Sequence, residues 1–148
     1  MKSATNKIPT RHLKLRKKIM DCIFCKIISG AIPAEKIYED KKVFAFLDIN
    51  PVAPGHVLVI PKKHHIIMAD VPDKLLGYCF IKTKDLMIKI RKALKADYVS
   101  VSVSGVDIPH FHIHLIPRYF NDGLKGWPTK TYPGGEIEKV AKKIKKFI

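Results

Sequence analysis

Alternating apolar and polar positions predict two neighbouring strands late in the chain. Segment 98–104 places valine at every second position with serine between, and segment 110–116 alternates histidine with Phe111, Ile113 and Leu115. Residues two apart point to the same face of a strand, so we expect these apolar side chains to face a core and the three imidazoles to lie opposite. The short connection between the segments favours an antiparallel pair, with its serine side towards the histidine side.

Three shorter apolar runs predict the rest of a sheet. Segments 36–39 and 43–47 are separated by Asp40-Lys41-Lys42, which is typical of a hairpin. A continuous apolar run over 57–60 stops at Pro61, which indicates a buried strand.

Two segments have helical spacing. The longer, 70–96, starts with Asp70 as a predicted N-cap and carries lysines on the side expected to face solvent. Its apolar face comprises Leu75, Cys79, Leu86, Ile90 and Leu94. A basic helix over 136–148 closes the chain, with an inner side predicted to comprise Ile137, Val140, Ile144 and Ile148. The pattern predicts an α+β fold, an antiparallel sheet of about five strands with one long and one or two short helices.

Composition narrows the class of protein. The chain has 148 residues, of which 47% are apolar, and no apolar run is long enough to cross a membrane. Three cysteines, an odd number, argue against a disulfide framework and favour a reducing, cytoplasmic location. The net charge of +15 favours an anionic partner, and by itself it does not separate nucleotide, nucleic acid and membrane surface.

Much of the positive charge lies in residues 1–20, which hold seven Lys or Arg and no acidic residue. Without a regular apolar period, this segment is predicted to be a disordered basic extension; a transit peptide is the alternative, disfavoured by the abundance of lysine. The predicted domain therefore spans 21–148, with 120–148 as a Gly- and Pro-rich loop followed by the basic helix.

The three alternating histidines are the strongest candidate for chemistry. Imidazole serves proton transfer, nucleophilic attack and metal ligation, whereas a merely solvated strand does not require it. Cys22-x-x-Cys25 leaves three interpretations open: a redox pair, two unrelated buried cysteines, or half of a zinc site. The sequence around the pair lacks the strand–helix pattern expected of a redox motif.

Four blocks in order resemble the histidine-triad (HIT) nucleotide-binding proteins. The first is Cys22-Ile23-Phe24-Cys25 with the Gly-Ala-Ile-Pro that follows, and the second is the Phe-Leu-Asp-Ile-Asn-Pro of residues 46–51. The third runs from Pro54 to His64, and the fourth is the histidine motif itself. The resemblance covers roughly residues 21–119 and implies an α+β fold, usually as a homodimer with one continuous sheet.

The resemblance also implies roles for individual residues. The family attacks the α-phosphorus of a nucleotide, and His112 corresponds to the nucleophile that becomes nucleotidylated. His114 and His56 correspond to histidines that hydrogen-bond around the phosphate. Asp48 corresponds to the carboxylate that binds the ribose hydroxyls, and Ser104 is a candidate phosphate donor. The expected base pocket comprises Phe24, Ile27, Ile32, Phe46, Leu47 and Ile49.

The implied activity is hydrolysis of purine nucleoside phosphoramidates or related adenylates. The alternatives are a dinucleoside polyphosphate hydrolase and a nucleotide-binding interaction protein with weak turnover. A subset of the family that carries the cysteine pair implies one structural zinc ion on Cys22, Cys25, His64 and His110. The lone Trp127 is expected near the partner subunit's active site, while membrane binding and nucleic-acid binding are not expected.

Overall fold

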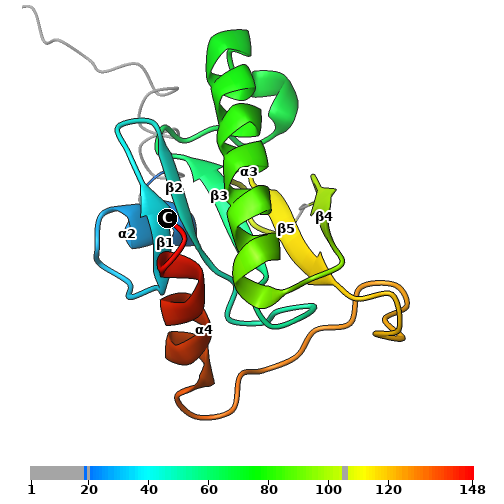
Figure 1. Cartoon of the computed structure of the whole chain (residues 1–148). Helices are drawn as coiled ribbons and strands as arrows, with labels where there is room; N and C mark the ends of the chain where they lie inside the picture. The colour runs from blue at the N-terminus through cyan, green and yellow to red at the C-terminus, as the bar shows by residue number, and fades with distance from the viewer. Residues whose placement is uncertain (1–18, 20, 105–106) are drawn as a thin grey trace, which may run out of the picture.

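The structure is a computed structural model, and it describes residue 19 and residues 21–104 and 107–148. Apart from Ile19, the predicted basic extension lies outside the described residues. Five strands form one antiparallel sheet in the order β1-β2-β3-β5-β4 (Figure 1). They are β1 (Lys36–Glu39), β2 (Val43–Leu47), β3 (Val57–Pro61), β4 (Tyr98–Ser102) and β5 (Ile113–Arg118). The helices are α2 (Ile23–Ile28), η1 (Met68–Asp70), α3 (Asp73–Leu94) and α4 (Glu136–Lys145). The α+β prediction is confirmed.

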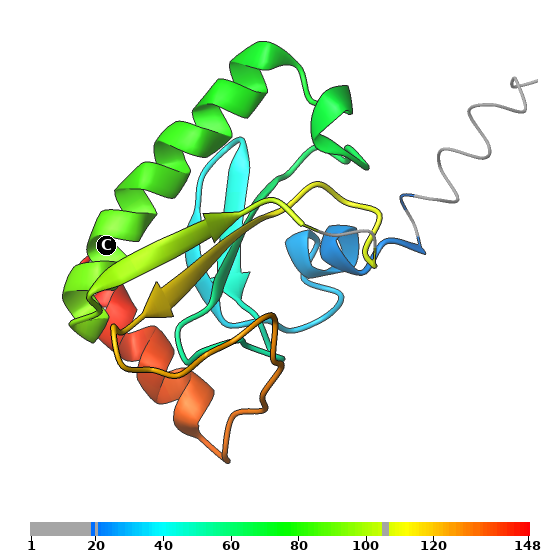
Figure 2. The same cartoon turned by 90° about the vertical axis from the view of Figure 1, so that its right-hand side faces the viewer.

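Helices cover the sheet on both faces, and Figure 2 shows α3 and α4 on one side and α2 on the other. The central strands β2 and β3 are buried along their whole length, which explains their unbroken apolar runs. Alternate residues such as Val43 and Val59 pack under α3 and α4, while Phe46 and Leu58 pack under α2. Each face of the sheet therefore has its own apolar cluster.

The long helix is shorter than the predicted 70–96, and the predicted N-cap Asp70 is wrong. Met68–Asp70 forms a separate 3-10 turn, and Pro72 occupies the cap position of α3 without a side-chain cap. Proline restricts the preceding residue to extended conformations, and Val71 is extended, so the helix cannot continue back through this point. At the other end, Lys95 adopts a left-handed conformation and stops the helix at Leu94.

The histidine segment also pairs over a shorter range than predicted. β5 begins only at Ile113, because the Phe111 amide donates to the carbonyl of His65 instead of to a neighbouring strand (2.6 Å). The alternation nevertheless holds, since Phe111, Ile113 and Leu115 all join the core beneath α3. The predicted serine-to-histidine pairing is confirmed by the register Ser102↔His114.

The C-terminal helix is likewise shorter than predicted. α4 ends at Lys145, so Ile148 lies beyond it and is exposed, while Val140 and Ile144 are buried as expected. Among the described residues, no helix is both long and apolar enough to cross a membrane.

Candidate active site and metal cluster

A cavity of about 350 Å³ opens on the face of the sheet that α2 covers. All eight residues predicted to bind a nucleotide line it: Phe24, Ile27, Ile32, Phe46, Leu47, Asp48, Ile49 and Ser104. His112 and His114 form part of the same wall. The structure therefore brings an apolar pocket, one carboxylate and two imidazoles together.

Several lining residues had not been predicted. They include Ile23, Pro33, Ala34, Asn50, Leu58, Asp107, Ile108 and Thr129. Ile23, Pro33 and Asn50 are direct sequence neighbours of predicted residues. Thr129 is far from them in sequence, and the path of the loop before α4 brings it to the cavity.

The protonation pattern of His112 follows from one hydrogen bond. Its Nδ1 lies 2.6 Å from the main-chain carbonyl of His110. A carbonyl only accepts, so Nδ1 carries a proton, and the neutral form of the ring is the tautomer with its lone pair on Nε2. The ring is 7% exposed and packs edge-on against Phe24, with centroids 5.3 Å apart. The hydrogen bond at Nδ1 thus fixes the orientation of the ring and selects the tautomer in which Nε2 is available as a nucleophile.

His56 and His114 form a directional hydrogen-bond chain. The Val52 amide donates to His56 Nδ1 (3.1 Å), so the proton of His56 lies on Nε2. That Nε2–H donates to His114 Nδ1 (2.9 Å), and His114 Nε2–H donates to the Ser104 carbonyl (2.8 Å). Burial, together with the charges of the neighbouring imidazoles of His114 and His112, lowers the pKa of His56 to about 3, which keeps this residue neutral.

The predicted contact of His56 with a phosphate stays a prediction. His56 is 0% exposed and is absent from the cavity wall, because it lies behind His114. Through its hydrogen bond to His114 Nδ1, His56 orients the His114 ring. The sequence did not predict this contact, because the pairing of β3 with β5 that brings the two residues together is a tertiary feature.

Asp48 occupies the end of β2 at the edge of the cavity. The Asn50 amide donates to its Oδ1 (2.9 Å), while its own amide donates to the His56 carbonyl. Burial raises the pKa of the Asp48 carboxyl, and the Asn50 hydrogen bond opposes that effect. Because His56 is neutral, the 3.9 Å between Asp48 Oδ2 and His56 Nδ1 is not an ion pair, and the carboxylate retains acceptor capacity.

Trp127 lies at the imidazoles of its own chain. Its ring is 4.9 Å from that of His114 and 5.9 Å from that of His56, both edge-on. Trp127 therefore forms part of the wall of its own cavity, and its position near the partner subunit's site stays a prediction. Sequence spacing could not assign it, because the loop before α4 lacks any periodic pattern.

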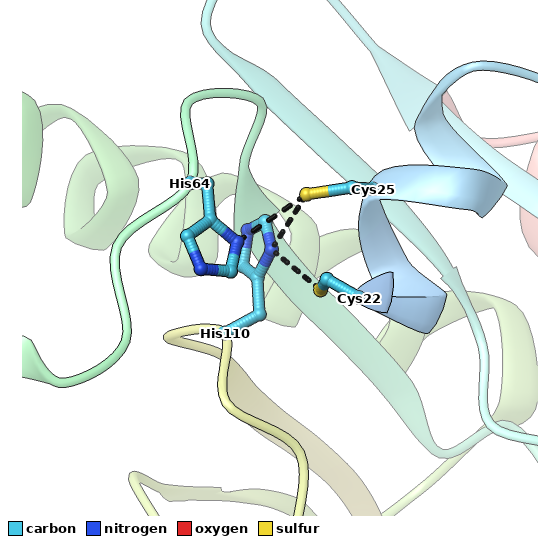
Figure 3. A group of neighbouring side chains, drawn as sticks. All are labelled: Cys22, Cys25, His64 and His110. Atoms are coloured by element: carbon cyan, nitrogen blue, oxygen red, sulfur yellow. Dashed lines mark hydrogen bonds between the residues drawn. The ribbon is translucent and has the colours of Figure 1, made fainter. Parts of the chain in front are cut away.

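The four residues predicted to hold a metal ion converge next to this cavity (Figure 3). Cys22 and Cys25 come from the start of α2, His64 from the segment after β3, and His110 from the segment before β5. The sulfur of Cys22 lies 3.5 Å from His110 Nδ1, and the sulfur of Cys25 lies 3.3 Å from His64 Nδ1 and 3.6 Å from His110 Nδ1. All four ligand atoms lie within 4.8 Å of one another.

The donor set fits zinc. Bonds of about 2.3 Å to sulfur and about 2.1 Å to nitrogen at tetrahedral angles separate the two ligand atoms by about 3.6 Å, close to the distances found here. His110 Nε2 donates to the Pro61 carbonyl (2.9 Å), so Nδ1 presents a lone pair to the sulfurs. Burial and the neighbouring Cys22 raise the pKa of Cys25 to about 12, and a bound cation would reverse that effect.

Comparison with known proteins identifies one family. The sequence profile described as HIT domain matches residues 29–121. A HIT-like protein of Methanocaldococcus jannaschii is 43% identical over 131 residues, which are 84% of this chain and 98% of that protein. The adenosine 5'-monophosphoramidase of Saccharomyces cerevisiae is 38% identical over 130 residues, 83% of this chain and 80% of that protein.

A solved structure shows the same fold. The zinc-bound histidine triad family protein from Mycobacterium smegmatis superposes with a TM-score of 0.77 at 30% identity, covering 86% of this chain and 93% of that chain. The profile match, the relatives and the shared fold together show that this chain belongs to the HIT domain family.

Proposed function

We propose that this chain hydrolyses purine nucleoside phosphoramidates or related adenylates at the α-phosphate. The observation that carries the proposal is the orientation of His112, which lines a cavity of about 350 Å³ while its Nδ1 donates to the His110 carbonyl. The similarity to a protein named adenosine 5'-monophosphoramidase supports this substrate class.

In the proposed complex, the base lies among the apolar residues of the cavity and the ribose hydroxyls donate to Asp48. This arrangement directs the α-phosphate towards His112 and His114. A phosphate oxygen that arrives beside Ser104 takes over the Nε2–H donor of His114, which stabilises the charge that develops on phosphorus. His56 supports this step only by fixing the tautomer of His114.

The proposed reaction has two steps. His112 Nε2 forms a bond to phosphorus while the bond from phosphorus to the leaving group breaks, and the electron pair goes to the leaving group. Water then attacks phosphorus and the bond to Nε2 breaks. In sum, the hydroxyl of one water ends on phosphorus, its proton ends on the leaving group, and neutral His112 is restored.

Release of AMP from a panel of substrates tests the function. We expect the purified chain to release AMP from an adenosine phosphoramidate faster than from adenylyl sulfate or diadenosine tetraphosphate, as followed by chromatography. Fastest cleavage of the dinucleotide would favour the dinucleoside polyphosphate hydrolase instead. Binding of AMP without release from any substrate would favour a nucleotide-binding interaction protein.

We further propose that Cys22, Cys25, His64 and His110 bind one structural zinc ion. When bound, zinc on this set has four protein ligands and no open position, so it joins segments rather than activating water. The ligands come from α2, from the segment after β3 and from the segment before β5, and the ion would tie these three together. Zinc in the Mycobacterium smegmatis neighbour supports the assignment.

We also propose a homodimer that forms through β4. This strand lies at the edge of the sheet, and the apolar side chains of Tyr98, Val101 and Val103 beside that edge are each more than 40% exposed. Ile81 and Ile88 extend the exposed apolar surface along α3. An antiparallel β4–β4 contact would give hydrogen-bond partners to the backbone N–H and C=O groups at the edge of the sheet, and it would join two sheets into one.

Replacing Val101 with aspartate should convert the dimer to a monomer. The substitution places a charge at the centre of the proposed contact, where it would be desolvated and opposed by its own copy across the two-fold axis. Light scattering should then give the mass of one chain, 16.8 kDa, instead of twice that value. As a control, Ile148→Asp at the exposed C-terminus should remain dimeric, and a monomeric wild-type chain would contradict the interface.

A further inference from the structure

A second cavity, of about 310 Å³, is surrounded by lysines. Lys41, Lys42, Lys62, Lys63 and Lys74 line it, and no carboxylate does. The β1–β2 turn, the end of β3 and the first turn of α3 contribute these residues, and Figures 1 and 2 both place that turn and the start of α3 at the same end of the molecule. This lysine groove shares none of its lining residues with the cavity at His112.

The backbone around the lysine groove is held firmly. Asp40 accepts hydrogen bonds from the amides of Lys42 and Val43 (2.7 and 2.8 Å) and from the hydroxyls of Tyr38 and Tyr78 (2.7 and 2.6 Å). The Lys62 amide donates to the Lys42 carbonyl (2.8 Å). With four donors, the Asp40 carboxylate fixes the turn.

The charge of the groove is poorly compensated within the chain. Of its five lysines, only Lys62 has a carboxylate within ion-pair distance in the part of the chain that the structure describes, namely Glu39 at 2.6 Å. Lys42 lies over the ring of Tyr78, 4.8 Å from its centroid. Lys74 lies in the first turn of α3, where the helix dipole disfavours a cation. An anion with several charges would relieve this repulsion.

We propose that the lysine groove binds the phosphate chain of a small polyanion, such as a tripolyphosphate. Lysine ammonium groups act as point charges that bind phosphate, and the volume lies at the lower end of the range for small-ligand sites. Pro72 and Leu75 complete the lining, which contains no aromatic ring. Single-stranded nucleic acid is recognised through base stacking on such rings, so the groove favours phosphate chains over bases.

Calorimetric titration with sodium tripolyphosphate at physiological salt tests the proposal. We expect Lys41→Glu, Lys42→Glu and Lys74→Glu, combined in one chain, to weaken binding at least about tenfold. A chain with Lys84→Glu, Lys139→Glu and Lys142→Glu has the same net charge with reversals on exposed faces of α3 and α4, and should change binding less than about twofold. Equal affinity of both variants would overturn the proposal, because net charge alone would then explain binding.

Additional ligands identify the source of the phosphates, and a milder variant keeps the test valid if the glutamate variant misfolds. Glutamine at the same three groove positions provides a milder variant, which should also weaken binding if the glutamate chain does not fold. Tighter binding of ATP than of tripolyphosphate, lost in the groove variant, supports a nucleotide source, and the reverse order supports an inorganic one. Groove-dependent binding of a single-stranded oligonucleotide without binding of tripolyphosphate would overturn the proposal. AMP release should be unchanged in all variants, which separates this result from the proposed function.

Discussion

Replacing His112 with alanine should reduce AMP release at least about a thousandfold, because removal of a covalent nucleophile leaves only the residual effect of binding. The cavity is otherwise formed by other residues, so affinity for AMP should change by less than about fivefold. Rapid-quench kinetics and calorimetry measure the two effects separately. These two results together would assign the loss of activity to the chemical step and not to weaker nucleotide binding.

Mass spectrometry of quenched wild-type protein provides the direct observation. One nucleotidyl group should be found on His112, and none should form in His112→Ala. As a matched control, His114→Ala should slow turnover while the adduct still forms. An adduct on His110 would contradict the assignment, and the structure argues against it because His110 is 0% exposed with Nδ1 directed at the two cysteine sulfurs.

Replacing Cys22 with serine should remove zinc and lower the melting temperature by roughly 10 °C. The variant loses one of four ligands, which should lower the free energy of unfolding by about 3–4 kcal/mol. For a domain of this size, each kcal/mol lowers the melting temperature by roughly 2–4 °C. Atomic absorption and thermal unfolding without chelator measure both effects. Cys25→Ser should behave in the same way.

Cys79 offers an internal control, because it is a buried cysteine on α3 outside the cluster. Cys79→Ala should keep near-stoichiometric zinc even if it loses some stability. Metal-free wild-type protein whose melting temperature equals that of Cys22→Ser would contradict the zinc assignment and favour two packing cysteines.

The periodic parts of the sequence predicted most of the fold. The predicted ranges 36–39 and 43–47 are those of β1 and β2. The apolar positions in these two segments are determined by burial within the sheet alone, so the sequence pattern matches the strands. The errors occur where local geometry overrides pattern. Pro72 prevents helix at Asp70, and the Phe111 amide pairs with a loop carbonyl, so the histidine strand starts later than its alternation indicates.

The site was predicted in a different way. The eight pocket residues came from resemblance to a family, since no spacing rule shows that Phe24 and Ser104 share a cavity. The alternation predicted that three imidazoles share one face of a strand, but it did not predict that they have different roles. His110 turns to the cysteines and His112 and His114 to the cavity, and that separation depends on tertiary partners such as the Pro61 carbonyl.

Each of the four histidines that are buried in the described part of the chain is oriented by a main-chain atom. Val52 N–H, the Pro61 carbonyl, the His110 carbonyl and the Ser104 carbonyl fix one ring each. Every amino acid supplies a carbonyl, and all but proline supply an N–H, so the side chains at Val52, Pro61 and Ser104 can vary without removing these contacts. A scan of single substitutions at these positions would therefore report how the side chains pack, and not the contacts by which their peptide groups orient the histidine rings.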